Sequence, residues 1–389
     1  MTGEKERIPA LDPSAEYAAA RGEIDAAVAR VLASGRYVGG PEIEGLEAEF
    51  AAFCGVAHAV AVSTGTDALR FALIAADLKA GAEVITSPFT FIGTTEAIHQ
   101  AGGKAVFADI VEETFALDPA RVRAAVTSRT AALMPVHLYG HPADMAAFEL
   151  LARERRLIVV EDACQAHGAS LGGRMAGALG TAGCFSFYPT KNLGACGEGG
   201  MVTTDDARLA ARVRRLRDHG QSEKYRHAEE GYNGRLDAVQ AAILRVKLRH
   251  LPAWNARRRA IAALYHGALS RLEQRGLLRL PIERPGARHA WHLYAVRIPD
   301  EAGRAAAGRP GRRDDVRERL AAQGIETGIH YPIPLHRQPA YEAMRLPEGS
   351  FPASERAARE VLTLPMHPHL EDRLAERVAQ ALGAALETA

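Results

Sequence analysis

The chain has 389 residues, of which 47% are hydrophobic and 24% are charged, and its formal net charge at pH 7 is +1. The near balance of basic and acidic residues excludes a global field that would attract nucleic acid or an anionic membrane, so recognition of phosphate must be local. No run approaches the roughly 18 apolar residues of a membrane span, and the charged start MTGEKERIPALD lacks the apolar core of a secretory signal. The length predicts two domains. The four scattered cysteines, with no CxxC pair, favour reduced thiols in a cytoplasmic protein.

Short apolar runs alternate with helical patterns between about residues 55 and 205. The runs lie at residues 58–62, 83–87, 104–109, 131–139, 157–162, 184–188 and 201–204. Helical patterns occur at 66–76, 92–101 and 142–155. Buried strands separated by helices predict an α/β fold with a mostly parallel sheet covered on both faces. Ligands of such sheets bind beyond the carboxyl ends of the strands, so we expect the chemically informative residues to follow these runs.

The pattern changes after about residue 235. Residues 235–275 predict one long helix, or two with a bend near Pro252. A strand at 291–298, a helix at 314–323 and two terminal helices follow. We therefore predict a large domain over residues 1–250, with an N-terminal segment that packs on the other domain, and a smaller α+β domain over residues 251–389.

A lysine in a glycine-rich turn is the first chemical signal. In FSFYPTKNLGACGEGGMVTT (185–204), Lys191 follows a predicted strand and a turn that begins at Pro189. Glycines permit backbone conformations and close approaches that side chains block. A lysine that its surroundings keep neutral can attack a carbonyl group and form a Schiff base. Taken alone, a lysine in a glycine-rich turn is usually a solvated loop residue.

A carboxylate at a strand end is the second signal. In IVVEDACQAHGA (158–169), Asp162 ends an apolar strand and Gln165 lies three residues later. Such an aspartate can be a simple helix cap. It can also keep a pyridinium nitrogen protonated, so that the ring accepts electrons, and Gln165 could then donate a hydrogen bond to the phenolic oxygen of that ring.

A strand-to-helix turn is the third signal. VSTGTDALRFAL (62–73) places Gly65, Thr66 and Asp67 at a predicted helix N-terminus, where free N–H groups and hydroxyls form a phosphate site or an ordinary capped turn. Ser186 and Asn233 are further candidates for phosphate contact. Phe91, in SPFTFIGTTEAI, could stack on a flat ring or belong to the core.

In combination and in this order, SGTDAL, TFIGTTEAI, VEDACQAHGA, FSFYPTKNLGACGEGG and GYNGRLDAVQAAIL resemble the DegT–StrS family of sugar aminotransferases. The resemblance extends from SGRYVGGPEIEGLEAEF (34–50) to HYPIPLH (330–336) and LPMHPHL (364–370). It implies the fold of type I pyridoxal-phosphate (PLP) enzymes, with a seven-stranded, mostly parallel sheet, and a homodimer with shared active sites. It also implies that Lys191 is the Schiff-base lysine and that Asp162 pairs with the pyridine nitrogen. By resemblance, the cofactor-binding residues are Gly65, Thr66, Asp67, Phe91, Asp162, Gln165, Ser186, Lys191 and, from the other subunit, Asn233.

The resemblance further implies the reaction. PLP, with pyridoxamine 5′-phosphate (PMP) as the intermediate form, would carry an amino group from a donor, glutamate in the family, to a nucleotide-linked keto sugar. By resemblance, the substrate-binding residues are Tyr188, Arg235, His330 and Tyr331. The sequence around Lys191 favours amination at C3 of a UDP- or dTDP-linked sugar. A 4-keto sugar or cyclitol aminotransferase and a regulatory or binding protein of the same fold are the alternatives. A nicotinamide-dependent dehydrogenase is disfavoured because STGTDA stands where GxGxxG would be needed.

Overall fold

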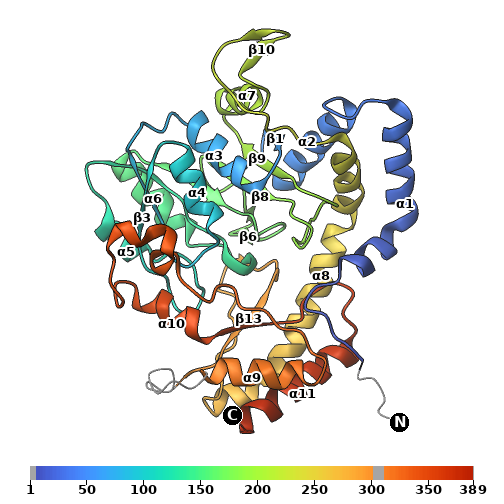
Figure 1. Cartoon of the computed structure of the whole chain (residues 1–389), viewed down its shortest axis with the longest axis vertical. Helices are drawn as coiled ribbons and strands as arrows, with labels where there is room; N and C mark the ends of the chain where they lie inside the picture. Colours follow the sequence, from blue (N-terminus) through green and yellow to red (C-terminus); the bar gives the residue numbers. More distant parts are fainter. Residues whose placement is uncertain (1–5, 301–310, 389) are drawn as a thin grey trace.

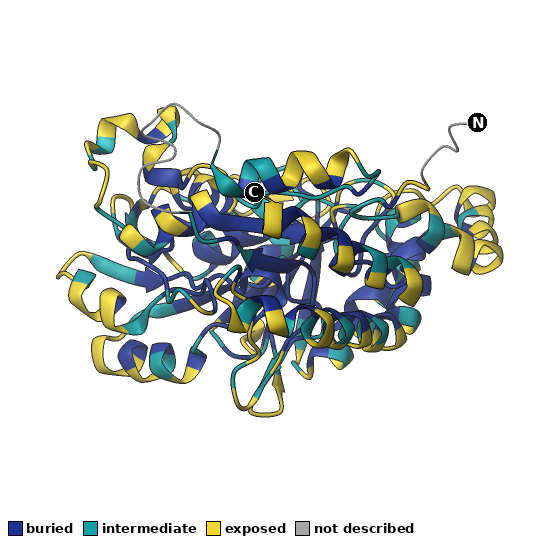
Figure 2. Ribbon diagram, turned by 90° about the horizontal axis from the view of Figure 1, so that it is seen from below, coloured by how far each residue is buried: buried dark blue, intermediate teal, exposed yellow. Residues whose placement is uncertain are grey.

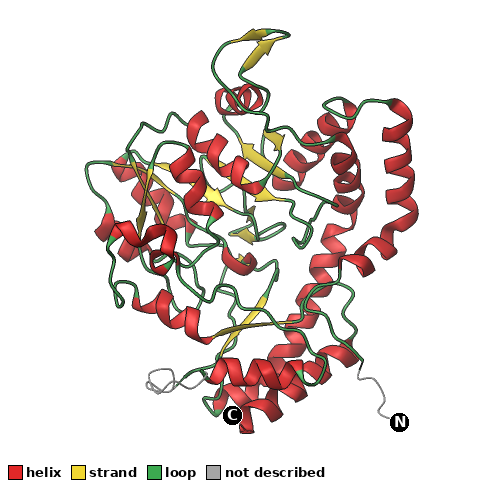
Figure 3. Cartoon of the chain, in the orientation of Figure 1, coloured by secondary structure: helices red, strands yellow, loops and turns green. Residues whose placement is uncertain are grey.

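A central seven-stranded sheet organises the chain in the computed structural model, which describes residues 6–300 and 311–388. The sheet, drawn yellow among red helices in Figure 3, has the strand order β1-β9-β8-β5-β4-β2-β3. Its strands are β1 (His58–Val62), β2 (Glu83–Thr86), β3 (Lys104–Phe107), β4 (Thr130–Leu133), β5 (Ile158–Asp162), β8 (Ala182–Ser186) and β9 (Gly200–Thr204). Pairs from β8 to β3 are parallel, whereas β9 runs antiparallel to both β8 and β1. The predicted mostly parallel sheet is confirmed.

Helices cover both faces of the sheet because successive residues of each strand point to opposite sides. In β1, Val60 and Val62 pack with α3 (Gly65–Ala75), α4 (Gly93–Gln100) and α7 (Ala207–Leu216). The alternate residues Ala59 and Ala61 pack with α2 (Pro41–Cys54) and the first part of α8. On that second face, α5 (Pro119–Ala125) and α6 (Met145–Arg155) cover β2, β4 and β5. Figure 2 shows the result as a buried, dark blue interior between layers with exposed outer surfaces.

A single long helix, α8 (Ala238–Gln274), links the two ends of the molecule in Figure 1. It spans 37 residues and contains Pro252, so the one-helix alternative is correct. The helix α1 (Pro13–Ser34) packs on its first part through buried apolar side chains. Because α8 runs across position 250, the boundary between the two domains stays a prediction.

The C-terminal part has its own hydrophobic core. There β13 (Tyr294–Arg297) pairs antiparallel with β14 (Val361–Leu364). Around this pair lie α9 (Arg312–Ala321), α10 (Pro352–Glu360), α11 (Asp372–Thr388) and the second part of α8. Ile8 joins this core through a bridge to Ile325, so the N-terminal segment packs here. The strand predicted at 291–298 begins only at Tyr294, because Trp291 has a φ of 49° and turns the chain.

Smaller elements complete the described chain. A three-stranded sheet consists of β6 (Ser170–Leu171), β7 (Arg174–Met175) and β12 (Ala287–Arg288). The hairpin of β10 (Gln221–Glu223) and β11 (Arg226–His227) projects from one end of the molecule (Figure 1). Short 3₁₀ helices are η1 (Leu138–Gly140), η3 (Leu335–Arg337) and η4 (Pro339–Met344). Among the described residues, no helix is both long and apolar enough to cross a membrane.

Candidate active site at the carboxyl edge of the sheet

Three chain segments leave the sheet side by side at one edge. Val62, the last residue of β1, and Ser186, the last residue of β8, both pair with Gly200 at the start of β9. Asp162, the last residue of β5, pairs with Cys184 of the neighbouring β8. The segments that follow β1, β5 and β8 carry the three sequence signals, so the topology brings these signals to a common edge.

Lys191 lies in a tight turn just beyond β8. Its N–H donates to the carbonyl of Tyr188 at 2.9 Å, and Gly194 closes the turn at a position where a Cβ would collide with the carbonyl of Pro189. The side chain is half-buried. Burial lowers the pKa of the Lys191 ammonium, and the nearby Cys164 and Asp162 oppose this shift. The lysine is thus biased toward the neutral amine that a nucleophile requires.

Asp162 is almost fully buried and its carboxylate is held by two donors. The Thr94 hydroxyl donates to Oδ2 at 2.8 Å, and the Cys164 N–H donates to Oδ1 at 3.3 Å. The charge of Asp162 acts to raise the pKa of the Lys191 ammonium, so the two side chains are close enough to interact. Their pairing in one catalytic site stays a prediction.

The orientation of the Gln165 amide follows from its hydrogen bonds. Its Oε1 accepts from the backbone N–H of Tyr139 at 2.7 Å, so the amide nitrogen must point the other way. There Nε2 donates to the hydroxyl of Tyr331 at 3.3 Å. Gln165 thus presents N–H groups to the site, which is the orientation that donation to a phenolic oxygen requires.

Aromatic and imidazole groups surround the same edge. The ring centroids of Phe91 and Tyr331 are 6.1 Å apart, and Phe91 remains 57% exposed. Burial and the charge of Asp162 raise the pKa of the Tyr331 hydroxyl, so this group stays protonated. Burial, reinforced by Lys191, lowers the pKa of His330 to about 4. The exposed ring of Phe91 packs near Tyr331, which interacts with Asp162, and so suits the stacking of a flat ring.

The N-terminus of α3 borders the site. The Thr64 side chain caps the helix by accepting from the N–H of Asp67 at 3.0 Å, which leaves the N–H groups of Gly65 and Thr66 without partners inside the helix. A Cβ on Gly65 would lie 2.6 Å from Cβ of Ser186, so only glycine fits between the two segments. The carboxylate of Asp67 is paired with Ser63 and Arg70. The free N–H groups, and not this carboxylate, could therefore bind a phosphate.

The side chains of three predicted residues make no hydrogen bond or ion pair with the other site residues in the described part of the chain. Asn233 is exposed, and within the described chain its side chain makes no hydrogen bond. Arg235 is ion-paired with Asp218, and Tyr188 is 48% exposed. Their proposed roles depend on ligands or on a second subunit.

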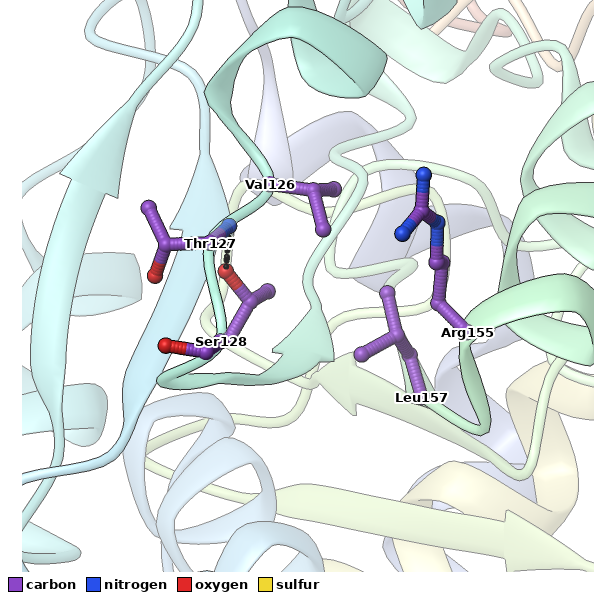
Figure 4. Close-up of a pocket in the computed structure, with 6 residues that line it drawn as sticks. Val126, Thr127, Ser128, Arg155 and Leu157 are labelled. Carbon is purple, nitrogen blue, oxygen red and sulfur yellow. Dashed lines mark hydrogen bonds between the residues drawn. The ribbon is translucent and has the colours of Figure 1, made fainter.

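The hollow drawn in Figure 4 belongs to the opposite edge of the sheet. It has a volume of about 380 Å³ and is lined by residues that precede β4 and β5, among them Thr127, Ser128 and Leu157. It carries no nucleophile next to a base. The carboxyl edge therefore remains the candidate active site.

Sequence reasoning missed three residues that support the site. Thr94 and Tyr139 bond Asp162 and Gln165, as described above. Buried Asn192 donates to Asn255 and to the carbonyl of Ala290, both at 2.9 Å, and so fixes the chain directly after Lys191. For Thr94, its place three residues after Phe91 in the quoted motif was the available signal. For Tyr139 and Asn192, no local pattern indicates a long-range partner.

The family model for the DegT/DnrJ/EryC1/StrS aminotransferases matches residues 19–383. The chain belongs to this family. Members of the family use PLP, so the predicted resemblance, enzyme class and cofactor are confirmed.

Relatives and solved structures of this aminotransferase family match nearly the whole chain. The dTDP-3-amino-3,4,6-trideoxy-α-D-glucose transaminase of Streptomyces venezuelae is 48% identical over 97% of this chain and 96% of its own length. The UDP-N-acetyl-3-dehydro-α-D-glucosamine 3-aminotransferase of Acidithiobacillus ferrooxidans is 41% identical over 96% of this chain and 97% of its own. The crystal structure of S. venezuelae DesV superposes with a TM-score of 0.92, at 48% identity, and covers 98% of this chain and 99% of that one. The predicted fold class is confirmed.

Proposed function

We propose that this aminotransferase moves an amino group onto the C3 carbonyl of a nucleotide-linked keto sugar, with Lys191 and Asp162 as its catalytic residues. One observation carries the proposal. At the carboxyl edge of the sheet, the half-buried Lys191 interacts electrostatically with the buried Asp162, whose carboxylate accepts two hydrogen bonds.

The residues at this edge fit the parts of PLP. The free N–H groups at the start of α3, with Thr66 and Ser186 beside them, suit the phosphate. Gln165 presents donors to the phenolic oxygen, and the exposed face of Phe91 is available for stacking. Asp162 suits the ring nitrogen, because both of its oxygens retain lone pairs beyond the two bonds described above.

Bound PLP supplies an electron sink for the carbon that loses a proton. Asp162 holds a proton on the ring nitrogen and so sustains that sink. Nζ of Lys191 would take up the proton that leaves the substrate carbon, and the lowered pKa of this amine suits it to accept that proton. Proton transfer by a positioned group is typically worth about 10²–10⁴-fold in rate.

Two relatives support amination at C3, because the names of both enzymes describe 3-amino products or 3-keto substrates. One of these substrates is linked to dTDP and the other to UDP. His330, which interacts electrostatically with Lys191, and Tyr331, which interacts with Asp162, are half-buried at this edge and are the proposed sugar contacts.

Further parts of the proposal concern the donor, assembly and location. Glutamate is the proposed amino donor, as the family resemblance implies. A homodimer with shared active sites gives a role to the exposed Asn233, which is proposed to bind the phosphate of the other subunit's cofactor. The four cysteines are all free, which supports a place in the reducing cytoplasm.

The lysine is tested by reducing the holoenzyme with borohydride and mapping the modified peptide. We expect the cofactor mass on the peptide that contains Lys191. Lys191→Ala should lose the visible cofactor absorbance and turnover while keeping its fold, whereas the surface variant Lys104→Ala should retain both. Turnover by Lys191→Ala, or modification of another lysine, would remove Lys191 from this role.

Substrate class is tested with matched ketones and glutamate. We expect the largest kcat/KM with dTDP- or UDP-linked 3-keto sugars. Faster amination of 4-keto sugars or of a cyclitol ketone would overturn the C3 assignment. A protein that binds PLP but turns over none of these ketones would instead be a regulatory or binding protein of the same fold.

A further inference from the structure

The Thr94 hydroxyl forms a hydrogen bond that its position in the helix does not require. Thr94 lies in the first turn of α4, where a threonine hydroxyl can bond a carbonyl of the preceding turn. The adjacent Thr95 does so, donating to the Ile92 carbonyl at 2.9 Å. Thr94 instead donates to Oδ2 of Asp162, a residue 68 positions later in the chain, at 2.8 Å. The contact therefore serves the carboxylate and not the helix.

A second hydroxyl extends this contact. The Oγ1 atoms of Thr90 and Thr94 lie 2.9 Å apart, and both side chains are buried. Thr94 has one hydroxyl proton, which it gives to Asp162, so Thr90 must be the donor in the bond between the two threonines. Chained hydrogen bonds polarise one another and strengthen in a low-dielectric interior. The pair of hydroxyls therefore forms a directed chain that ends on Oδ2.

The chain of hydroxyls determines which lone pairs remain for the cofactor. Oδ2 receives Thr94 and Oδ1 receives the N–H of Cys164 at 3.3 Å. Two donors on opposite oxygens fix the plane of the carboxylate of Asp162. A carboxylate held in a fixed plane is already oriented for a hydrogen bond with the ring nitrogen.

We propose that Thr94, assisted by Thr90, is a positioning residue that orients the carboxylate of Asp162 toward the cofactor. This inference rests on the proposed function, in which Asp162 faces the ring nitrogen. Thr94 touches neither substrate nor cofactor in this account and acts only through the aspartate.

The test is the holoenzyme with Thr94→Val, which has nearly the shape of threonine but no hydroxyl. Because the variant loses a hydrogen bond to a charged group, kcat should fall by about 10–100-fold. KM for the keto sugar should change by less than about 3-fold. The pH midpoint of the visible cofactor absorbance should rise, because a less positive ring holds its titrating proton more tightly. Thr94→Ser should restore both quantities to near wild-type values.

Thr95→Val is the matched control, since it makes the same change one residue along the same helix. It removes the bond to Ile92 and the 2.5 Å contact with the hydroxyl of Tyr341, so it reports any general damage to α4. We expect it to leave the absorbance midpoint unchanged and kcat within about 3-fold of wild type, as for residues that act on structure alone.

Wild-type kcat and absorbance midpoint in Thr94→Val would overturn the inference, as would equal effects of Thr94→Val and Thr95→Val. If Thr94→Val fails to fold, Thr90→Val provides the test. Its kcat should fall by about 2–5-fold, and an unchanged kcat would overturn the inference. A wild-type protein without cofactor absorbance or turnover would contradict the proposed function itself, which separates the two failures.

Discussion

The carboxylate of Glu161, next to Asp162 in β5, should be among the most sensitive positions for stability. Its side chain is fully buried and accepts four hydrogen bonds. Oε1 receives the N–H groups of Leu179 and Gly180, each at 2.7 Å. Oε2 receives the N–H of Gly177 at 2.8 Å and the ring of His137 at 2.9 Å.

Glu161→Gln preserves the shape and removes two of these acceptors. Whichever way the amide turns, its NH₂ group faces two donors and loses both bonds. His137 cannot adapt, because its Nδ1 already accepts from the N–H of Ala143 at 3.0 Å, so Nε2 must carry the proton. Hydrogen bonds to charged groups contribute about 1.5–3 kcal/mol each. The expected loss of unfolding free energy is therefore about 3–6 kcal/mol, a large share of the roughly 5–15 kcal/mol typical of proteins.

Urea unfolding of wild type and variant at pH 7.5 measures this loss through the change in midpoint and in extrapolated free energy. Glu154→Gln is the control, because Glu154 forms a 2.7 Å pair with Arg123 between side chains that are 40% and 50% exposed. That pair should contribute little to stability, because water screens an ion pair between exposed side chains. A loss below about 1 kcal/mol for Glu161→Gln would refute the reasoning, since it would show that the buried donors find other acceptors.

Three further changes test the site and its surroundings. Asp162→Asn should lower kcat by about 10²–10³-fold in a single-turnover assay, and activity within 3-fold of wild type would contradict its role at the ring nitrogen. Gly65→Ala brings a methyl group to 2.6 Å from Cβ of Ser186, so we expect a stability loss of about 1–3 kcal/mol in urea and weaker PLP binding by absorbance titration. Burial lowers the pKa of His167 to about 3, so this ring is neutral when folded and protonation favours unfolding. Stability should fall as pH decreases below about 6.5, by about 2 kcal/mol at pH 5 from this residue. His167→Asn should flatten that part of the urea-midpoint profile relative to the exposed control His227→Asn, and an unchanged slope would argue against a neutral His167.

Local sequence patterns predicted most of the helices and strands. The apolar runs that end at Val62 and Asp162 predicted β1 and β5 to within a residue, because both strands are buried on two faces over nearly their whole length. The run at 131–139 predicted more strand than forms, since β4 ends at Leu133 and the chain turns toward η1. Pro252 suggested a bend, yet it lies exposed on the outer face of α8, where the lost backbone bond can be replaced by water.

Part of the site was predictable for a geometric reason. Lys191 and Asp162 each follow a strand, and parallel strands end at a common edge, so their meeting required only that β5 and β8 be neighbours. The supporting contacts were not predictable. Thr94 reaches Asp162 across 68 positions and Tyr331 reaches Gln165 across 166, and such contacts depend on the packed fold, not on a local pattern.

The reversed direction of β9 has a consequence for how Lys191 is carried. A parallel neighbour would need a long crossover, but β9 returns beside β8, so the loop of Lys191 starts at Ser186 and ends at its own pairing partner Gly200. Both ends of that loop are anchored a single strand spacing apart. Folding therefore already restricts the conformations of the loop that carries Lys191. Little further conformational entropy has to be lost to position its amine in each catalytic cycle.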